Sequence, residues 1–183
     1  MSDVILNEEA EDYTWTSVMD KLFLFTDGSV DTKSKTGFGA YLFVTDTLVP
    51  VESLSKQIRV RRFNNTSSAR LELETIIWAF REIKESADRF IVYTDSQNIV
   101  GLKGRRERLE KNKFLSGKSK PLKNADLYIQ FYKITDRLNC EFIKVQGHIV
   151  SHKKDQIDKL FTLVDRESRN ALRKYNRSID PII

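Results

Sequence analysis

Three acidic side chains stand where the residue pattern predicts that one element ends or another begins. Asp27 follows the apolar run LFLFT and Asp95 follows the apolar run FIVYT, so each is expected to close a buried strand. Glu72 lies in the first turns of a segment, 64–87, whose apolar spacing predicts a helix. Ligands of open α/β sheets bind beyond the carboxyl ends of strands. The three carboxylates are therefore expected to meet if the two strands are parallel neighbours and the helix crosses that edge.

Carboxylates that converge on one point repel each other unless a cation neutralises them. Oxygen ligands of this kind favour a hard divalent metal, and Mg²⁺ fits best. Each acid also has a simpler interpretation when it is taken alone. Asp27 with Gly28 is a common turn pair, Asp95 is a suitable helix N-cap, and Glu72 is a typical surface residue of a helix. The metal-site hypothesis therefore rests on the three acids together.

The elements that must position these acids follow from the hydrophobic pattern. Alternating or continuous apolar runs predict strands, and apolar residues at helical spacing predict amphipathic helices. The order predicts an α/β domain with a mixed sheet, of which the first three strands form an antiparallel meander, covered by helices. Strands are expected at 21–29, 36–46, 49–61, 89–97 and 140–148, and helices at 64–87, from Ser96 onward, at 124–138 and at 153–175.

Length and composition set the broad class. With 183 residues the chain fits one domain, and its single cysteine, Cys140, excludes an internal disulfide framework. The N-terminus lacks the basic start and apolar core of a secretory signal, and no apolar stretch is long enough to span a membrane. We therefore expect a cytoplasmic protein with no membrane partner. We also expect a monomer, because nothing in the pattern suggests a large spare apolar face.

Charge is distributed unevenly along the chain. The net charge is +5, yet residues 1–20 carry six acids and no Lys or Arg. The segment 103–124 holds nine Lys or Arg against two Glu. Such a segment is either a solvated surface or a binding site for a polyanion. We expect an acidic N-terminal extension at 1–20 and a single domain at 21–183.

Six short motifs occur in an order and spacing that resemble type 1 ribonuclease H, over residues 22 to about 175. The resemblance implies a ribonuclease H-like fold with a five-stranded mixed sheet. It also implies an endoribonuclease that cleaves the RNA strand of RNA·DNA hybrids with two Mg²⁺ ions, for which Mn²⁺ is a possible substitute. The products would carry 5′-phosphate and 3′-hydroxyl ends, as in the removal of primer or R-loop RNA. The motifs are FTDGS, TGFGAYLF, TSSARLELETIIWAF, YTDSQ, KPLKNADLY and VQGH.

The same resemblance assigns roles to individual residues. Asp27, Glu72 and Asp95 match three of the family's four metal ligands. His148, in VQGH, matches a loop histidine that is thought to move a proton or to help the product leave. A histidine with an ordinary pKa near 6.5 suits that task.

The fourth carboxylate has two candidates. Asp158 stands at the family's usual interval after the loop histidine, but the bulky Phe161 follows where a small residue is usual. Asp165 has Ser168 and Ala171 to supply a small face, although it requires about two extra helical turns. Because the two aspartates are seven apart, they share one helix face. We favour Asp165 and expect only one of them to bind metal.

The basic segment 103–124 resembles the protruding handle of some bacterial-type members of the family, whose cations hold DNA phosphates. Phe114 and Leu115 stand where that handle usually interleaves tryptophans. The residues at the positions that recognise RNA in the family also differ from the family's usual pattern. Ser68 and Ala69 stand where an Asn or Gln is usual, and VDTKSKT stands where a glycine-rich loop is usual. The residues expected to contact nucleic acid are Gly28, Ser29, Ser68, Arg70, Lys103, Arg105, Arg106, Lys118 and Lys120.

Two other functions remain open on the sequence alone. One is a DNA-directed nuclease or strand-transferase of the same fold, against which the histidine motif and the handle argue. The other is a module that binds hybrids without cleaving them, which is favoured only if the carboxylates do not assemble.

Overall fold

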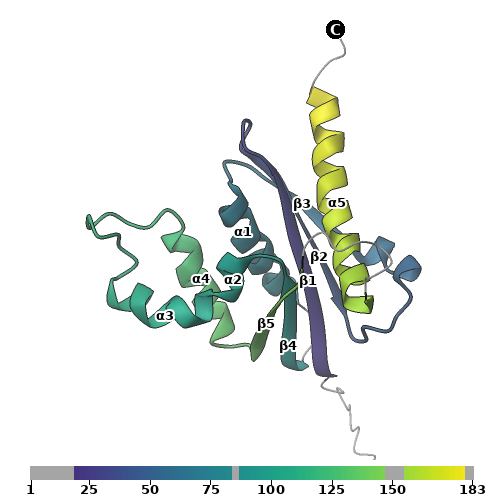
Figure 1. Cartoon of the computed structure of the whole chain (residues 1–183), viewed down its shortest axis with the longest axis horizontal. Coiled ribbons are helices and arrows are strands. Elements are labelled where there is room, and N and C mark those ends of the chain that lie inside the picture. The colour runs from purple at the N-terminus through teal and green to yellow at the C-terminus, as the bar shows by residue number, and fades with distance from the viewer. Residues whose placement is uncertain (1–18, 84–86, 147–154, 180–183) are drawn as a thin grey trace, which may run out of the picture.

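The computed structural model describes residues 19–83, 87–146 and 155–179, which form a five-stranded sheet with helices on both faces (Figure 1). The strand order is β3-β2-β1-β4-β5. β1 pairs antiparallel with β2 and parallel with β4, β2 pairs antiparallel with β3, and β4 pairs parallel with β5. This is the mixed sheet that was predicted. The strands are β1 Met19–Asp31, β2 Thr36–Val44, β3 Arg59–Phe63, β4 Ala87–Thr94 and β5 Cys140–Lys144.

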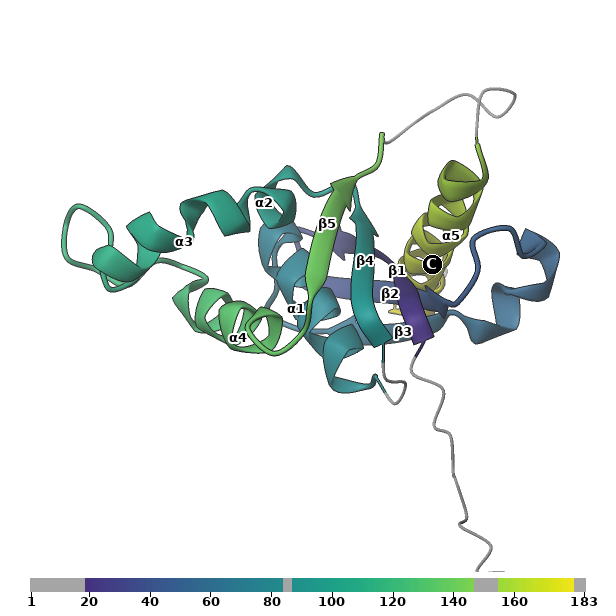
Figure 2. The same ribbon diagram turned by 90° about the horizontal axis from the view of Figure 1, so that it is seen from below.

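The helices divide between the two faces of the sheet. α5 packs on β1 and β2 from one side, whereas α1 and α4 pack together on the other, as Figure 2 shows from below. No helix among the described residues combines the length and the apolar character needed to cross a membrane. The helices are α1 Ser68–Arg81, α2 Gln97–Val100, α3 Leu102–Lys111, α4 Ala125–Thr135 and α5 Gln156–Ile179.

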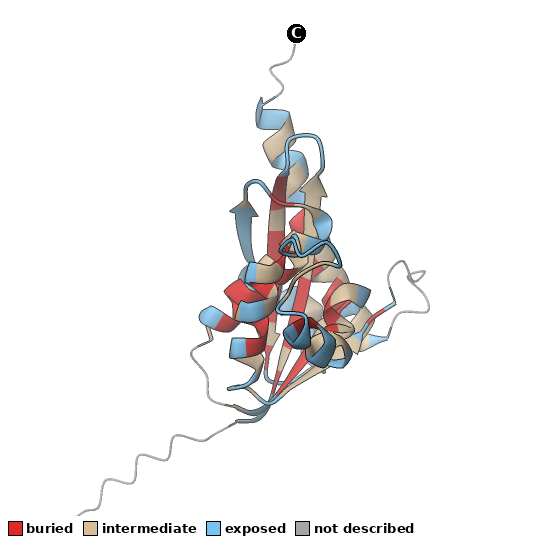
Figure 3. Ribbon diagram, turned by 90° about the vertical axis from the view of Figure 1, so that its left-hand side faces the viewer, coloured by how far each residue is buried: buried red, intermediate tan, exposed pale blue. Residues whose placement is uncertain are grey.

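Each face of the sheet buries its own apolar cluster, because the side chains of a strand alternate between its faces. Leu24 of β1 packs in the cluster that contains Ile76 of α1. Its neighbour Phe25 packs in the other cluster, with Val164 of α5. Buried residues gather where the helices meet the strands (Figure 3). The alternation fixes which side chains of β1 face α5, and Asp27 is one of them.

β1 continues beyond Asp27, so the prediction that this residue closes its strand is wrong. Asp27 pairs with Ala40, and the ladder between β1 and β2 runs on to Asp31. The turn comes only after Asp31, whose carboxylate accepts a 2.9 Å hydrogen bond from the backbone N–H of Lys33. Because long-range pairing with β2 extends the strand, Asp27 and Gly28 do not form a turn.

The third strand is shorter than predicted. Two short 3₁₀ helices, Val51–Ser53 and Ser55–Gln57, lie within the expected segment 49–61. They bring Leu54 into the core, where it is 2% exposed. β3 begins only at Arg59. Burial of Leu54 therefore outweighs the strand preference of the flanking residues.

Two glycines let α1 approach the hairpin of β1 and β2 closely. A Cβ atom at Gly28 would lie 2.8 Å from Cγ of Leu71, and one at Gly39 would lie 2.1 Å from Oγ1 of Thr75. Such contacts are too short for carbon atoms in a packed core. On the α1 face, Leu71 therefore takes the space beside Gly28, and the close packing holds α1 against the sheet.

Candidate active site

Asp27 lies in the middle of β1 on the face that α5 covers. Its Oδ2 atom accepts a 2.6 Å hydrogen bond from the hydroxyl of Ser168 in α5. Burial raises the pKa of Asp27 to about 6, and the negative charges of Asp165 and Asp95 act in the same direction. The Ser168 hydroxyl lowers this pKa but does not restore the usual value. Asp27 is therefore a buried carboxylate that lies near two other negative charges.

Asp95 reaches the same edge from β4. The parallel ladder between β1 and β4 ends where Phe25 pairs with Tyr93, and these two rings stack with centroids 4.9 Å apart. Two residues further along each strand stand Asp27 and Asp95. Because side chains alternate along a strand, Asp27 leaves the backbone on the face of that stacked pair. Asp95 is exposed, directly after the last residue of β4.

Glu72 arrives from α1 and is held by serines. The Ser96 hydroxyl donates a hydrogen bond to its carboxylate, as does the Ser68 side chain. Burial raises the pKa of Glu72, and the charge of Asp95 raises it further, against the effect of these hydrogen bonds. Asp95 thus acts on both Glu72 and Asp27. The three acids that the sequence singled out are electrostatic neighbours.

The two candidates for the fourth carboxylate have different surroundings. Asp165 is among the charges that raise the pKa of Asp27, and Asp158 is not. The Asp158 carboxylate accepts a 3.2 Å hydrogen bond from the backbone N–H of Asp155, whose own carboxylate accepts one of 2.8 Å from the N–H of Asp158. This reciprocal pair is a capping box at the start of α5. Asp158 is therefore paired at the start of α5, whereas Asp165 acts on Asp27 and is paired with Arg169.

Ser168 links α5 to β1 at this point. It is fully buried, and its hydroxyl also lies 3.0 Å from the backbone carbonyl oxygen of Asp165. On the outer side, the Arg169 guanidinium forms a 2.8 Å ion pair with the Asp165 carboxylate. The small side chain of Ser168 lets the helix come close enough for its hydroxyl to bind Asp27 directly.

Four carboxylates form a donor set of the kind that Mg²⁺ favours. Burial is the main cause of the raised pKa of Asp27, and Asp165 and Asp95 add negative charge that a cation would neutralise. The residues present therefore fit a divalent ion in chemistry. Within the described ranges, however, no three His, Cys, Asp or Glu side chains are grouped so as to hold an ion. Asp27, Glu72 and Asp165 each face a donor of the protein instead, namely Ser168, Ser96 and Arg169.

Several residues expected to contact nucleic acid make contacts within the protein. Arg70 donates two hydrogen bonds, of 3.1 and 2.9 Å, to the Asp126 carboxylate, and it also pairs with Glu74. Neighbouring negative charge raises the pKa of Arg70 accordingly. Arg70 thus joins α1 to α4. Ser29 is half-buried on β1. The side chain of Ser68 forms a hydrogen bond with Glu72.

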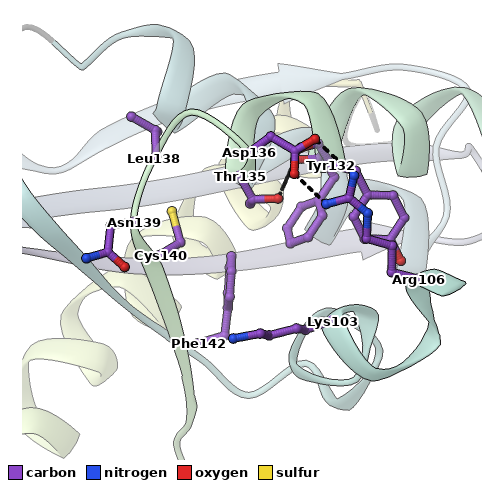
Figure 4. Close-up of a pocket in the computed structure, with 10 residues that line it drawn as sticks. Lys103, Arg106, Tyr132, Thr135, Asp136, Leu138, Asn139, Cys140 and Phe142 are labelled. Atoms are coloured by element: carbon purple, nitrogen blue, oxygen red, sulfur yellow. Dashed lines mark hydrogen bonds and ion pairs between the residues drawn. The ribbon is translucent and has the colours of Figure 1, made fainter.

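The handle is attached to the body through two arginines. Arg105 binds the backbone carbonyl of Gly101 at 3.1 Å and the Asn98 side chain at 2.7 Å. Arg106 lies over the Tyr132 ring and pairs with Asp136 of the segment after α4 (Figure 4). Lys103, Lys118 and Lys120 are exposed, and no ion pair is recorded for them with any described residue.

Apolar contacts also anchor the handle, although it lacks tryptophans. Leu109 is buried, and the Phe114 ring lies 6.3 Å from that of Tyr132. Leu115 and Pro121 form a β-bridge that closes the loop after α3. The handle therefore has a fixed base on α4, and Lys118 and Lys120 lie on a loop that the bridge closes. Lys103 lies on α3.

One predicted site residue cannot be placed, and two site residues were not predicted. His148 lies outside the described residues. Ser96 and Ser168 were not among the predicted site residues, yet each binds a candidate carboxylate. Ser96 carried a detectable signal, because it follows a strand and begins a helix, as N-cap residues do. Ser168 carried none beyond its small size.

The strand order, with helices on both faces of the sheet, defines a ribonuclease H-like fold. The same fold occurs in a solved structure of the foamy viral protease-reverse transcriptase in complex with dsDNA. That likeness has a TM-score of 0.56 and 11% sequence identity, and it covers 85% of this chain and 97% of that chain. The family model RNase H matches residues 19–164. The chain therefore belongs to the ribonuclease H family.

Curated relatives agree with this assignment. The ribonuclease H of Moorella thermoacetica is 28% identical over 145 residues, which span 78% of this chain and 90% of the relative. That of Chlorobium luteolum is 29% identical over 143 residues, which span 76% of this chain and 92% of the relative. The family match ends one residue before Asp165, so the choice between Asp165 and Asp158 depends on the structural surroundings described above.

Proposed function

We propose that this protein hydrolyses the RNA strand of RNA·DNA hybrids in a reaction that depends on Mg²⁺. The observation that carries the proposal is a pair of hydrogen bonds, from Ser168 to Asp27 and from Ser96 to Glu72. They place α5, which carries Asp165, beside Asp27, and the chain next to Asp95 beside Glu72, in a protein of the ribonuclease H family. Burial raises the pKa of Asp27 and that of Glu72, and the nearby charge of Asp95 adds to both rises.

In this proposal Asp27, Glu72, Asp95 and Asp165 hold two Mg²⁺ ions, for which Mn²⁺ can substitute. Bound there, the metal supplies an activated water and a stabilised leaving 3′ oxygen, so the products carry 5′-phosphate and 3′-hydroxyl ends. The protein contributes orientation: Ser168 holds Asp27 and Ser96 holds Glu72. Each carboxylate keeps lone pairs for an ion while it accepts the serine hydrogen bond.

Substrate binding is assigned to the exposed lysines of the handle. Lys103, Lys118 and Lys120 are exposed, and each is suited to contact a phosphate without reading sequence. Arg105 and Arg106 support the handle from within. His148 is proposed to move a proton or to assist product release. The expected setting is a cytoplasmic monomer that removes primer or R-loop RNA.

The test compares three labelled duplexes of equal length, an RNA·DNA hybrid, duplex DNA and duplex RNA, each with Mg²⁺ and with EDTA. We expect cleavage of the RNA strand of the hybrid only, in Mg²⁺ only, and fragments that a ligase requiring 5′-phosphate accepts. A hybrid that is bound but left intact would support the binding module instead. Cleavage of duplex DNA at an equal rate would support the DNA-directed nuclease.

A further inference from the structure

The second half of α5 carries a row of arginines that the proposed function does not use. Arg166, Arg169, Arg173 and Arg177 follow one another at spacings of three, four and four, which places them on one side of the helix. We call these four residues the arginine stripe. All four are exposed. Resting on the proposed function, we infer that the arginine stripe binds phosphates of the hybrid beside the cleavage site.

The stripe begins next to the candidate carboxylates. Arg166 follows Asp165 in the chain, and Arg169 forms an ion pair with it. At a rise of about 1.5 Å per residue, the stripe extends about 16 Å from Arg166 to Arg177. Figures 1 and 2 place α5 and the handle on opposite sides of β1 and β4. A duplex centred on the acids would therefore meet basic surface on both flanks.

The second half of α5, which carries the stripe, contacts the sheet through Tyr175. The Tyr175 ring lies 5.7 Å from that of Phe38 on β2, and the Arg62 guanidinium of β3 lies 4.8 Å from the centre of the Tyr175 ring. Phe38 pairs with Ser29, two residues beyond Asp27 on β1. Tyr175 therefore places the second half of α5 beside the part of β1 that follows Asp27.

Helix stability alone does not explain these charges. Arginines four apart, such as Arg169 with Arg173 and Arg173 with Arg177, repel each other on a helix surface. The helix dipole favours cations only within about the last turn, which accounts for Arg177 but not for Arg166 or Arg169. Among the described residues, no ion pair is recorded for Arg166, Arg173 or Arg177. A polyanion satisfies all of them at once.

Phosphate is the anion that this arrangement suits. Guanidinium groups bind phosphate oxygens with two parallel hydrogen bonds. A regular row of them matches the repeating charge of a nucleic-acid strand better than a single small anion. Continuity with the carboxylate site selects the strand phosphates of the bound hybrid as the occupant.

The test measures binding of the full chain to a fluorescent hybrid of about 20 base pairs in EDTA, as a function of salt. The variant Arg166→Gln/Arg173→Gln/Arg177→Gln omits Arg169 because of its contact with Asp165. Each lost phosphate contact reduces the slope of log K against log salt by about 0.9. We expect the slope to fall by two to three and the affinity at 0.1 M salt to fall at least about tenfold.

A matched control removes three exposed lysines elsewhere, as Lys21→Gln/Lys56→Gln/Lys133→Gln. Its net charge equals that of the arginine variant, and its slope is expected to change by less than one. Replacing the three arginines by lysines should preserve the slope, because the charges remain. Equal slopes for the arginine variant and the control would overturn the inference. Failure of the wild type to cleave hybrid would overturn the proposed function separately.

Discussion

Asp27→Asn is expected to be more stable, relative to the wild type, at pH 8 than at pH 4 when metal is absent. The quantity compared is the free energy of unfolding of the two proteins at each pH. Asp27 is held away from water beside Asp165 and Asp95, and these surroundings raise its pKa to about 6. Between pH 4 and pH 6 the folded state therefore retains a proton that the unfolded chain has lost. The ionised carboxylate disfavours folding, so stability is lost as the pH rises through 6.

The magnitude follows from the two pKa values. A rise from 3.8 to about 6 corresponds to about 3 kcal/mol of folding free energy at about 1.4 kcal/mol for each pKa unit. This penalty is absent below about pH 3, where both states bind the proton, and complete above about pH 7. Asn has nearly the shape of the protonated acid and carries no charge at any pH. The stability of Asp27→Asn relative to the wild type should therefore increase by up to about 3 kcal/mol between pH 4 and pH 8.

Urea denaturation of both proteins in EDTA at several pH values measures this difference. Asp88→Asn provides a control, because Asp88 is an exposed acid on β4. Its difference from the wild type should stay within about 0.5 kcal/mol across the same range. A flat difference for Asp27→Asn, or one of opposite sign, would refute the view that Asp27 is a desolvated carboxylate among like charges.

Three further outcomes are expected from the same geometry. Ser168→Ala removes the hydroxyl that binds Asp27, so it should destabilise the protein by about 1–3 kcal/mol at pH 8 and by less at pH 4, as urea denaturation at the two pH values will measure. Gly28→Ala places a methyl group 2.8 Å from Leu71 and should cost about 1–3 kcal/mol, whereas Gly104→Ala in α3, where nothing lies within 4 Å, should be neutral or stabilising in thermal denaturation. Titration calorimetry should show Mg²⁺ binding weaken as the pH falls below about 6, because protons compete for Asp27.

Much of the fold could be predicted because its signals are local. The run FIVYT marks a strand buried on both faces, and the spacing of Leu71, Ile76 and Ile77 marks the buried side of α1. The position of Asp27 within β1 could not be predicted, because it depends on pairing with β2 across the hairpin. For the same reason the contact between Gly28 and Leu71 has no local signature.

Some residues of the candidate site could be predicted from the sequence and others could not. Asp27, Glu72 and Asp95 could be selected from their places in the elements. The choice between Asp158 and Asp165 depends on how α5 lies against β1, which no local pattern determines. The contact of Ser168 with Asp27 and the capping box at Asp158 distinguish the two aspartates, but both are visible only in the folded structure. The pairing of Arg70 and Arg106 with distant acids was hidden for the same reason.

The site would be defined most directly by the rate at which Asp165→Asn and Asp158→Asn cleave an RNA·DNA hybrid at saturating Mg²⁺. Asp165 belongs to the group of acids that act on Asp27, so its loss should lower the rate at least about a hundredfold. Loss of the Asp158 carboxylate removes a helix cap worth about 1 kcal/mol of stability and should leave the rate within about threefold of the wild type. Near-normal cleavage by Asp165→Asn together with inactivity of Asp158→Asn would contradict the proposed site.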